Sequence, residues 1–373
     1  MSYALTTLWY ERQRYLPGIL AVGFSALLIA FQTGLLLGLF SITSIPVDYT
    51  NADIWIGSPN VLSVDLGRPI PESFRDRLAD QPEVKSTEIF MEGFAYWGKE
   101  KGDSELCIVV GSRLEDGSMG ALSQLTREMR NKLTEPRAII VNDAEMSRLG
   151  IERVGDYAEI NGQRVRVVDT VPGLKSLAGP YVFCSLTTAR ELIHLGPEHT
   201  IFILGKCHDP NDAANVVKRL ASKYDNMSVF TKSQFSVRTQ LQWLLKTKGG
   251  IALGFAAALG LLVGAVVTSQ TLYAATAASL REYAVLRALG IPRWRMAAAV
   301  LAQSFWVGII GIAVAVPAVY LAREAAELAG GAKVLLPYWL VGGTSFVTMA
   351  MALLSGLAAL RSLRLIEPAT LLR

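Results

Sequence analysis

The residues best suited to chemistry lie close together in the second half of the chain. His194, His199, Cys207 and His208 carry donor atoms that zinc accepts as ligands. Cys207 and His208 are neighbours at the end of an expected strand, where successive side chains point to opposite faces. The group is either a metal site or a set of solvated loop residues. We favour the second interpretation because the spacing matches no zinc-binding motif.

Catalytic and nucleotide-binding signatures are missing from the sequence. It contains no His-Glu-x-x-His, no Gly-x-Ser-x-Gly and no Gly-x-x-x-x-Gly-Lys-Ser/Thr. The three cysteines, Cys107, Cys184 and Cys207, form no Cys-x-x-Cys, and the sequence does not tell which pair, if any, is bonded. We therefore predict no catalytic residue, no bound cofactor and no metal, so that energy for any work must come from a partner.

Four runs without a charged residue predict four membrane spans, at 16–47, 249–280, 296–322 and 334–360. The runs contain no carboxylate, lysine or histidine of the kind that ion-coupled carriers use as relays. The whole chain is 51% hydrophobic and 18% charged, and most of its charge lies between the first two runs. The expected fold is an α-helical membrane protein with four transmembrane helices and a large α+β extracytoplasmic domain inserted between helices 1 and 2.

These patterns give a full set of expected boundaries. They are an interfacial N-terminal helix (1–15), transmembrane helix 1 (16–45), the extracytoplasmic domain (46–240), a stalk with transmembrane helix 2 (241–280), a cytoplasmic loop (281–295), transmembrane helix 3 (296–321), transmembrane helix 4 (337–360) and a cytoplasmic tail (361–373). Within the large domain, strand and helix signals predict two β-α-β halves, at about 51–90 and 199–230, around a strand-rich middle segment.

The distribution of basic residues orients the spans. Arginines precede the first run, fill the loop at 281–295 and follow the last run. Because cytoplasmic loops are enriched in lysine and arginine, we expect both termini inside and the large domain outside a cytoplasmic membrane. The net charge of +4 gives no case for binding nucleic acid.

The loop between the second and third spans has the layout of a docking helix. Helix-forming residues run from Leu280 to Leu289, Gly290 can end the helix, and Pro292 prevents its continuation. A short apolar stripe flanked by charges suits a groove on another protein. The alternative is a basic anchor with no partner. The candidate contact residues are Arg281, Glu282, Tyr283, Leu286, Arg287, Leu289 and Gly290.

Glycines four residues apart occur in two of the spans. Such pairs let helices approach closely, either within one chain or between two copies. The pairs are Gly34 with Gly38, Gly250 with Gly254, and Gly260 with Gly264. A self-associating membrane protein with few helices would use them in a dimer.

Two segments resemble a known family of membrane proteins. Residues 281–290 are similar to the R-E-x-x-x-L-R-A-x-G segment of MacB/LolCE/FtsX-type ABC transporter permeases, and residues 361–373 resemble their R-x-x-x-x-x-x-P-A-x-x-L-R ending. The order of one span, a large domain and three spans also matches. Within this group, residues 51–57 and 280–290 look most like the DevC permeases of DevBCA-type exporters.

The resemblance implies several partners. Two copies of a separate ATP-binding subunit would bind ATP and Mg²⁺ and dock on the helix at 281–290, and a second permease copy would complete the dimer. A membrane-fusion adaptor, a TolC-like outer-membrane protein and membrane lipid are implied as well. ATP-driven closure would move the outer domain by mechanotransmission, which fits spans that lack charge.

Three functions follow as alternatives. The first is the permease subunit of a tripartite exporter of lipids, glycolipids or other amphiphiles. The second is an FtsX-like subunit that regulates periplasmic cell-wall hydrolases without transport. The third, a membrane-anchored sensor without an ATPase, leaves the structured inner loop unexplained.

Overall fold

The computed structural model describes residues 10, 12–99, 102–176, 178–278, 285, 292–330 and 333–364. The chain divides into two compact units. The first unit contains Met1–Leu39 and Lys248–Arg373, and the second contains Phe40–Thr247.

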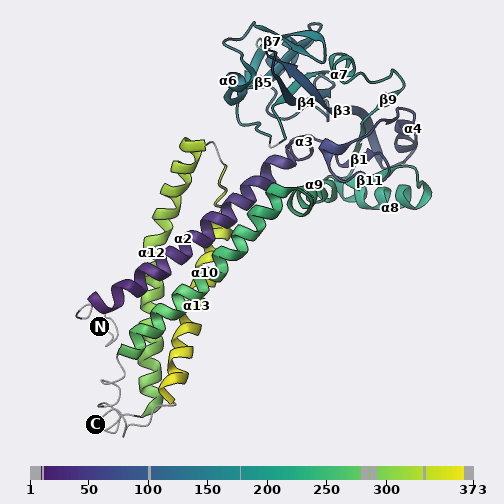
Figure 1. Ribbon diagram of the computed structural model, residues 1–373. Helices are drawn as coiled ribbons and strands as arrows, with labels where there is room; N and C mark the ends of the chain where they lie inside the picture. The colour runs from purple at the N-terminus through teal and green to yellow at the C-terminus, as the bar shows by residue number, and fades with distance from the viewer. Residues whose placement is uncertain are drawn as a thin grey trace. The chain divides into compact units, whose positions relative to one another are not determined.

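Four long helices dominate the first unit (Figure 1). They are α2 (Arg12–Thr43), α10 (Lys248–Ala278), α12 (Arg293–Gly330) and α13 (Tyr338–Arg364). Each contains a stretch long and apolar enough to cross a membrane, at Tyr15–Thr43, Lys248–Thr271, Ala297–Leu328 and Tyr338–Leu357. The four apolar helices expected from the sequence are therefore present.

One of these helices starts before the charge-free run that predicted it, and another is longer than its run. Helix α2 begins at Arg12, so residues 12–15 continue into the first span instead of ending a separate interfacial helix, and residues 1–9 and 11 lie outside the described part. Helix α12 extends to Gly330, beyond the predicted end at 321. An ion pair between Arg323 and Glu327, four residues apart at 2.9 Å, supports this added turn.

The second unit is built on one nine-stranded mixed sheet in the order β11-β1-β10-β3-β4-β8-β5-β7-β6. Its strands are β1 (Ile54–Gly57), β3 (Val84–Gly98), β4 (Ser104–Ser112), β5 (Ala138–Asn142), β6 (Tyr157–Ile160), β7 (Gln163–Val171), β8 (Tyr181–Ser185), β10 (Phe202–Cys207) and β11 (Ser228–Thr231). A separate two-stranded sheet pairs β2 (Ile70–Pro71) with β9 (His199–Thr200).

Short helices pack around this sheet (Figure 1). They are α3 (Ile45–Asp48), α4 (Phe74–Ala79), α5 (Arg127–Lys132), α6 (Met146–Leu149), α7 (Leu186–Leu192), α8 (Ala213–Lys223) and α9 (Lys232–Lys246), with 3-10 turns η1 (Val64–Leu66), η2 (Asp143–Glu145) and η3 (Pro210–Asp212). Three clusters of buried apolar side chains fill the spaces between the helices and the sheet, so the unit has a core of its own.

The two predicted β-α-β halves lie next to each other instead of at opposite ends. Strand β10 pairs antiparallel with β1 and with the start of β3, and β1 pairs antiparallel with β11. Strand β3 is 15 residues long and continues from this region to pair with β4 and β6 of the middle segment. The halves and the middle segment are therefore parts of one sheet, which local patterns could not show.

Residues 161–162 form a hairpin turn between β6 and β7. Strands β6 and β7 pair antiparallel, with Ile160 opposite Gln163. Asn161 and Gly162 both have positive φ, at 48° and 78°. Positive φ at both central residues is the requirement of a type I′ turn.

The predicted boundary at 240/241 falls inside helix α9. Phe235 of this helix is fully buried in the core of the second unit, and the unit extends to Thr247. At Thr247 the backbone is extended, with φ −93° and ψ 145°. Helices α9 and α10 are thus two separate helices, and residues 241–246 of the predicted stalk belong to α9.

Candidate functional site

The predicted docking segment lies almost entirely outside the described residues. Val285 is described, is helical and has 49% of its side chain exposed. The predicted contact residues Arg281, Glu282, Tyr283, Leu286, Arg287, Leu289 and Gly290 lie outside the described part of the chain. Their role as a docking surface stays a prediction.

The described flank of this segment presents an aromatic and a cationic group. Helix α12 starts at Arg293, and the amide of Arg295 donates to the carbonyl oxygen of Pro292 at 3.0 Å. Trp294 is 67% exposed, and the guanidinium carbon of Arg295 lies 5.3 Å from the centre of its ring. Tryptophan and arginine are the residue types most enriched at the energetic centres of protein interfaces.

Gly34 and Gly38 pack against the segment that joins α12 to α13. The amide of Leu335 donates to the carbonyl oxygen of Gly34 at 3.1 Å. A Cβ atom added at Gly34 would lie 2.9 Å from Cγ1 of Val334, and one added at Gly38 would overlap the carbonyl oxygen of Lys333. Both glycines are therefore required by a close contact within one chain.

Gly260 and Gly264 bring α10 against α2. A Cβ atom at Gly260 would overlap the side-chain oxygen of Gln32, and one at Gly264 would lie 3.2 Å from Cβ of Ser25. Ser25 is buried and donates to the carbonyl oxygen of Gly264 at 3.1 Å, while Thr268 donates to the Ser25 hydroxyl at 3.1 Å. Close approach of the backbones is what makes this polar bridge possible.

Other small-residue contacts were missed by the sequence reasoning. Gly23 of α2 faces Gly311 of α12, where an added Cβ would lie 3.2 Å from the Gly311 carbonyl oxygen. Gly308 of α12 packs on Met349 of α13, with an added Cβ 2.9 Å from the sulfur. These glycines do not form pairs four residues apart in one helix, so the spacing rule could not identify them.

The second unit does not assemble the histidines and Cys207 into a site. Cys207 is buried in β10, whereas the next residue, His208, donates its amide to the Glu83 carbonyl oxygen. His199 pairs with Pro71 in the small sheet, and His194 lies in a turn with φ 53°. Among the described residues no group of three or more His, Cys, Asp or Glu side chains could hold a metal ion.

The three cysteines are free thiols in the interior of the second unit. Burial raises the pKa of Cys107 to about 12 and that of Cys207 to about 11, so both remain protonated and unreactive at neutral pH. Cys184 is buried on β8.

Glu92 is a buried carboxyl group on β3, opposite Val110 of β4. It is 1% exposed, and neither of its oxygens has a hydrogen-bond partner among the described residues. Removal from water raises its pKa well above 4.5, and the nearby charge of Asp65 in η1 raises it further. An isolated buried charge is costly, so the folded unit favours the protonated form of Glu92.

Glu92 should make the stability of the second unit fall as pH rises. Its pKa is higher in the folded than in the unfolded chain, so its favourable contribution is complete below about pH 4.5 and is lost as pH rises through the folded pKa. In that interval the slope approaches about 1.4 kcal/mol per pH unit. Glu92→Gln should flatten this dependence and raise the unfolding midpoint at alkaline pH. Thermal unfolding at several pH values measures this pH dependence of stability. Glu115→Gln, at an exposed position, is the control and should keep the wild-type slope.

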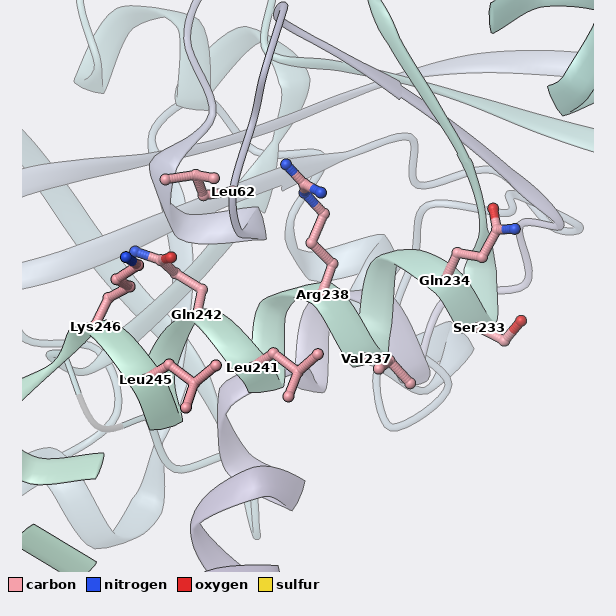
Figure 2. Close-up of a pocket in the computed structure, with 9 residues that line it drawn as sticks. All are labelled: Leu62, Ser233, Gln234, Val237, Arg238, Leu241, Gln242, Leu245 and Lys246. Carbon is pink, nitrogen blue, oxygen red and sulfur yellow. The ribbon is translucent and has the colours of Figure 1, made fainter. Parts of the chain in front are cut away.

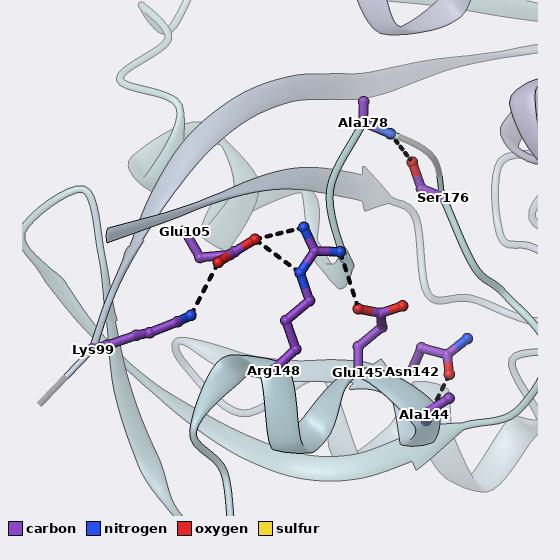
Figure 3. Close-up of polar contacts among 8 residues, drawn as sticks. All are labelled: Lys99, Glu105, Asn142, Ala144, Glu145, Arg148, Ser176 and Ala178. Carbon is purple, nitrogen blue, oxygen red and sulfur yellow. Dashed lines mark hydrogen bonds and ion pairs between the residues drawn. The ribbon is translucent and has the colours of Figure 1, made fainter. Parts of the chain in front are cut away.

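A cluster of charged residues at the start of β4 has a structural role (Figure 3). Glu105 accepts hydrogen bonds from Lys99 at 3.0 Å and from Nε of Arg148 at 2.8 Å, and Arg148 also pairs with Glu145 at 3.4 Å. The bonds from Lys99 and then Arg148 lower the pKa of Glu105. The cluster joins strands β3 and β4 to α6, and every acidic group in it has a basic partner.

An apolar groove of the second unit runs along α9 (Figure 2). Its volume is about 580 Å³. Val237, Leu241 and Leu245 project from one side of the helix, whereas Arg238, Gln242 and Lys246 project toward the loop that carries Leu62. The four apolar side chains are between 43% and 60% exposed. Sequence reasoning missed this groove because it assigned residues beyond 240 to a stalk.

Comparison with known proteins gives a match in the C-terminal part. Residues 254–368 match the family model described as FtsX-like permease C-terminal, a range that covers most of α10 and all of α12 and reaches beyond the end of α13. The comparison with curated proteins gave no match. The C-terminal part of the chain is thus similar to FtsX-like permeases.

Solved structures of outer domains are also similar to this chain. One is the periplasmic region of MacB from Actinobacillus actinomycetemcomitans, at 13% identity over 54% of this chain and 97% of that one, with a TM-score of 0.35. Another is the extracellular domain of the ABC-type transporter YknZ from Gram-positive bacteria, at 12% identity over 48% and 100%, with a TM-score of 0.32.

Proposed function

We propose that this chain is the permease subunit of an ABC transporter and acts in the export of lipids, glycolipids or other amphiphiles. The match of residues 254–368 to an FtsX-like permease domain is the observation that supports this assignment most strongly. The separate α+β unit inserted between α2 and α10 supports it as well, because it provides a large domain for contacts outside the hydrocarbon core.

In this proposal the energy comes from ATP bound by two separate ATP-binding subunits. They would dock on the segment at 281–290, beside the exposed Trp294 and Arg295. Movement there would pass along α10, which is a helix of 31 residues, toward α9 and the second unit. The buried polar bridge between Ser25 and Gly264 would make α2 move with α10.

A second copy of the chain would pack on α10. Only 17% of the most apolar stretch of α10 is buried within the chain, against 39% of the corresponding stretch of α2. A set of its apolar side chains is exposed: Ile251, Phe255, Leu259, Leu262 and Val266. Gly254, in the same helix, would then serve the dimer. We propose that the unit outside the membrane binds an adaptor and an outer-membrane duct.

Charge reversal in the docking segment tests this function. Glu282→Lys and Leu286→Asp should remove binding of the ATP-binding subunit and the ATPase stimulation by this chain, because each places an unfavourable charge in the interface. We expect a loss of at least tenfold in affinity, which is about 1.4 kcal/mol. Co-purification from membranes and ATPase assays in nanodiscs measure it.

Glu324→Lys provides the matched control. It makes the same charge change at an exposed position near the other end of α12 and should retain wild-type binding. Normal ATPase binding by both docking variants would contradict the docking assignment. ATPase coupling without export, together with capture of a cell-wall hydrolase, would instead favour the FtsX-like regulatory role.

A further inference from the structure

Helix α9 has an exposed apolar side that no described part of the chain covers fully. Val237, Leu241 and Leu245 are four residues apart and are 52%, 46% and 60% exposed. The opposite side of the helix is anchored, because Phe235 and Thr239 are fully buried and Thr239 accepts a hydrogen bond from the amide of Val64 at 3.3 Å. The apolar side is therefore held in a fixed orientation on a packed domain.

The charged residues of α9 and of the two residues that follow it are all basic. Residues 232–248 contain Lys232, Arg238, Lys246 and Lys248 and no aspartate or glutamate. Lys246 and Lys248 are exposed at the C-terminal end of the helix. An apolar stripe bordered by lysine and arginine is the composition of helices that lie in the interface of a membrane with anionic lipids.

The length of α10 places the end of α9 at the depth of the lipid headgroups. Helix α10 contains 31 residues, which span about 46 Å. A bilayer with its headgroup regions is about 40–45 Å thick. If the inner end of α10 lies at one headgroup layer, Lys248 lies at the other, and α9 ends only two residues before it.

The connection between the helices allows α9 to leave the direction of the span. Thr247 has an extended backbone, so α9 does not have to continue α10 away from the bilayer. Trp243, four residues after Thr239, lies on the anchored side of α9 and donates its indole N–H to Asp65 at 3.3 Å, so it helps to hold the stripe facing away from the domain.

We propose that α9 binds the surface of the bilayer at the outer end of α10, with Val237, Leu241 and Leu245 among the acyl carbons and Lys246 and Lys248 at anionic headgroups. This contact would hold the α+β unit against the membrane and would give an amphiphile leaving the bilayer an apolar path along α9. The membrane contact itself does not depend on an ATPase, so it can fail or hold independently of the proposed export function.

Spin labels on the full-length protein test the proposal. Leu241→Cys and Leu245→Cys place labels on the stripe, and the native cysteines are at most 3% exposed and should not react. Lys218→Cys on α8 is the aqueous control, and Phe346→Cys, 75% exposed within the apolar span of α13, is the acyl-chain control. The protein is placed in vesicles of phosphatidylethanolamine and phosphatidylglycerol, and collisions with oxygen and with a water-soluble nickel chelate are measured.

The expected result is an oxygen-to-nickel collision ratio at 241 and 245 that approaches the ratio at 346 and exceeds the ratio at 218 severalfold. The ratio should fall in vesicles of phosphatidylcholine alone, and equal ratios in the two lipids would overturn the assignment of anionic headgroups. Labels at 241 and 245 that behave like the label at 218 would overturn the membrane contact. Protection from both reagents, with spin–spin broadening that disappears on dilution with unlabelled protein, would overturn it in favour of a second copy.

Discussion

Gly38→Val is expected to prevent the four helices of the first unit from packing. A Cβ atom at this position would overlap the carbonyl oxygen of Lys333, which belongs to backbone and cannot rotate away. The neighbouring Val334 is fully buried, so the segment has no free space into which it could shift. Overpacking usually costs about 1–3 kcal/mol where side chains can yield, and we expect a larger cost here.

The yield of monodisperse protein in detergent and its unfolding midpoint measure the effect of Gly38→Val. Gly342→Val is the matched control, because an added Cβ at Gly342 of α13 would meet no heavy atom within 4 Å. The control should keep nearly wild-type stability. A normal midpoint for Gly38→Val would show that residues 333–336 do not pack on α2, and a dimer contact would then be the better explanation of this glycine.

The helices of the first unit were predictable because each contains a long run without charge. The residues against which these helices pack were not predictable. Spacing alone marked Gly34, Gly38, Gly260 and Gly264 as close-packing positions, and the residues that they meet come from distant parts of the chain. A dimer would require the same small residues as the contacts seen within one chain. The sequence therefore identifies where backbones approach, whereas the structure shows which backbones they are.

In the second unit, local signals predicted elements better than their arrangement. The turn at Asn161 and Gly162 needs only two residues with positive φ, so the sequence specifies it directly. The pairing of β1 with β10 joins residues about 150 positions apart, with Ile54 opposite Gly205. No periodic pattern encodes such a partner, because both strands are buried on both faces and carry no alternation.

The two candidate surfaces, the docking segment at 281–290 and the apolar stripe on α9, also differ in how well the sequence predicts them. The docking segment was predicted from the sequence because its helix, glycine and proline signals are contiguous. The stripe on α9 was missed although Val237, Leu241 and Leu245 have regular spacing, since the same spacing fits a helix that buries those residues. Exposure distinguishes the two cases, and exposure depends on Phe235 having turned the other side of α9 into the core.

Trp55→Ala is expected to be the most destabilising single change in the second unit. Trp55 is fully buried, and its ring lies 5.3 Å from Phe90 of β3, 5.5 Å from Phe202 of β10 and 5.4 Å from Phe235 of α9. Truncation of such a side chain leaves a cavity and costs about 3–5 kcal/mol. For a unit of this size the unfolding midpoint should fall on the order of 10 °C.

Trp55→Phe separates the loss of packing from the loss of the indole N–H. That N–H has no hydrogen-bond partner among the described residues, so its removal costs nothing in bonding and the phenyl ring keeps most of the aromatic contacts. We expect a much smaller fall for Trp55→Phe, and almost none for Tyr96→Ala, which is 62% exposed in the same unit. Calorimetry of the full-length protein gives the three midpoints.

Because Phe235 fixes α9 to the sheet through Trp55, the alanine variant should also lose the fixed orientation of the apolar stripe. Equal midpoints for the alanine and phenylalanine variants would mean that the aromatic cluster does not hold α9 in place.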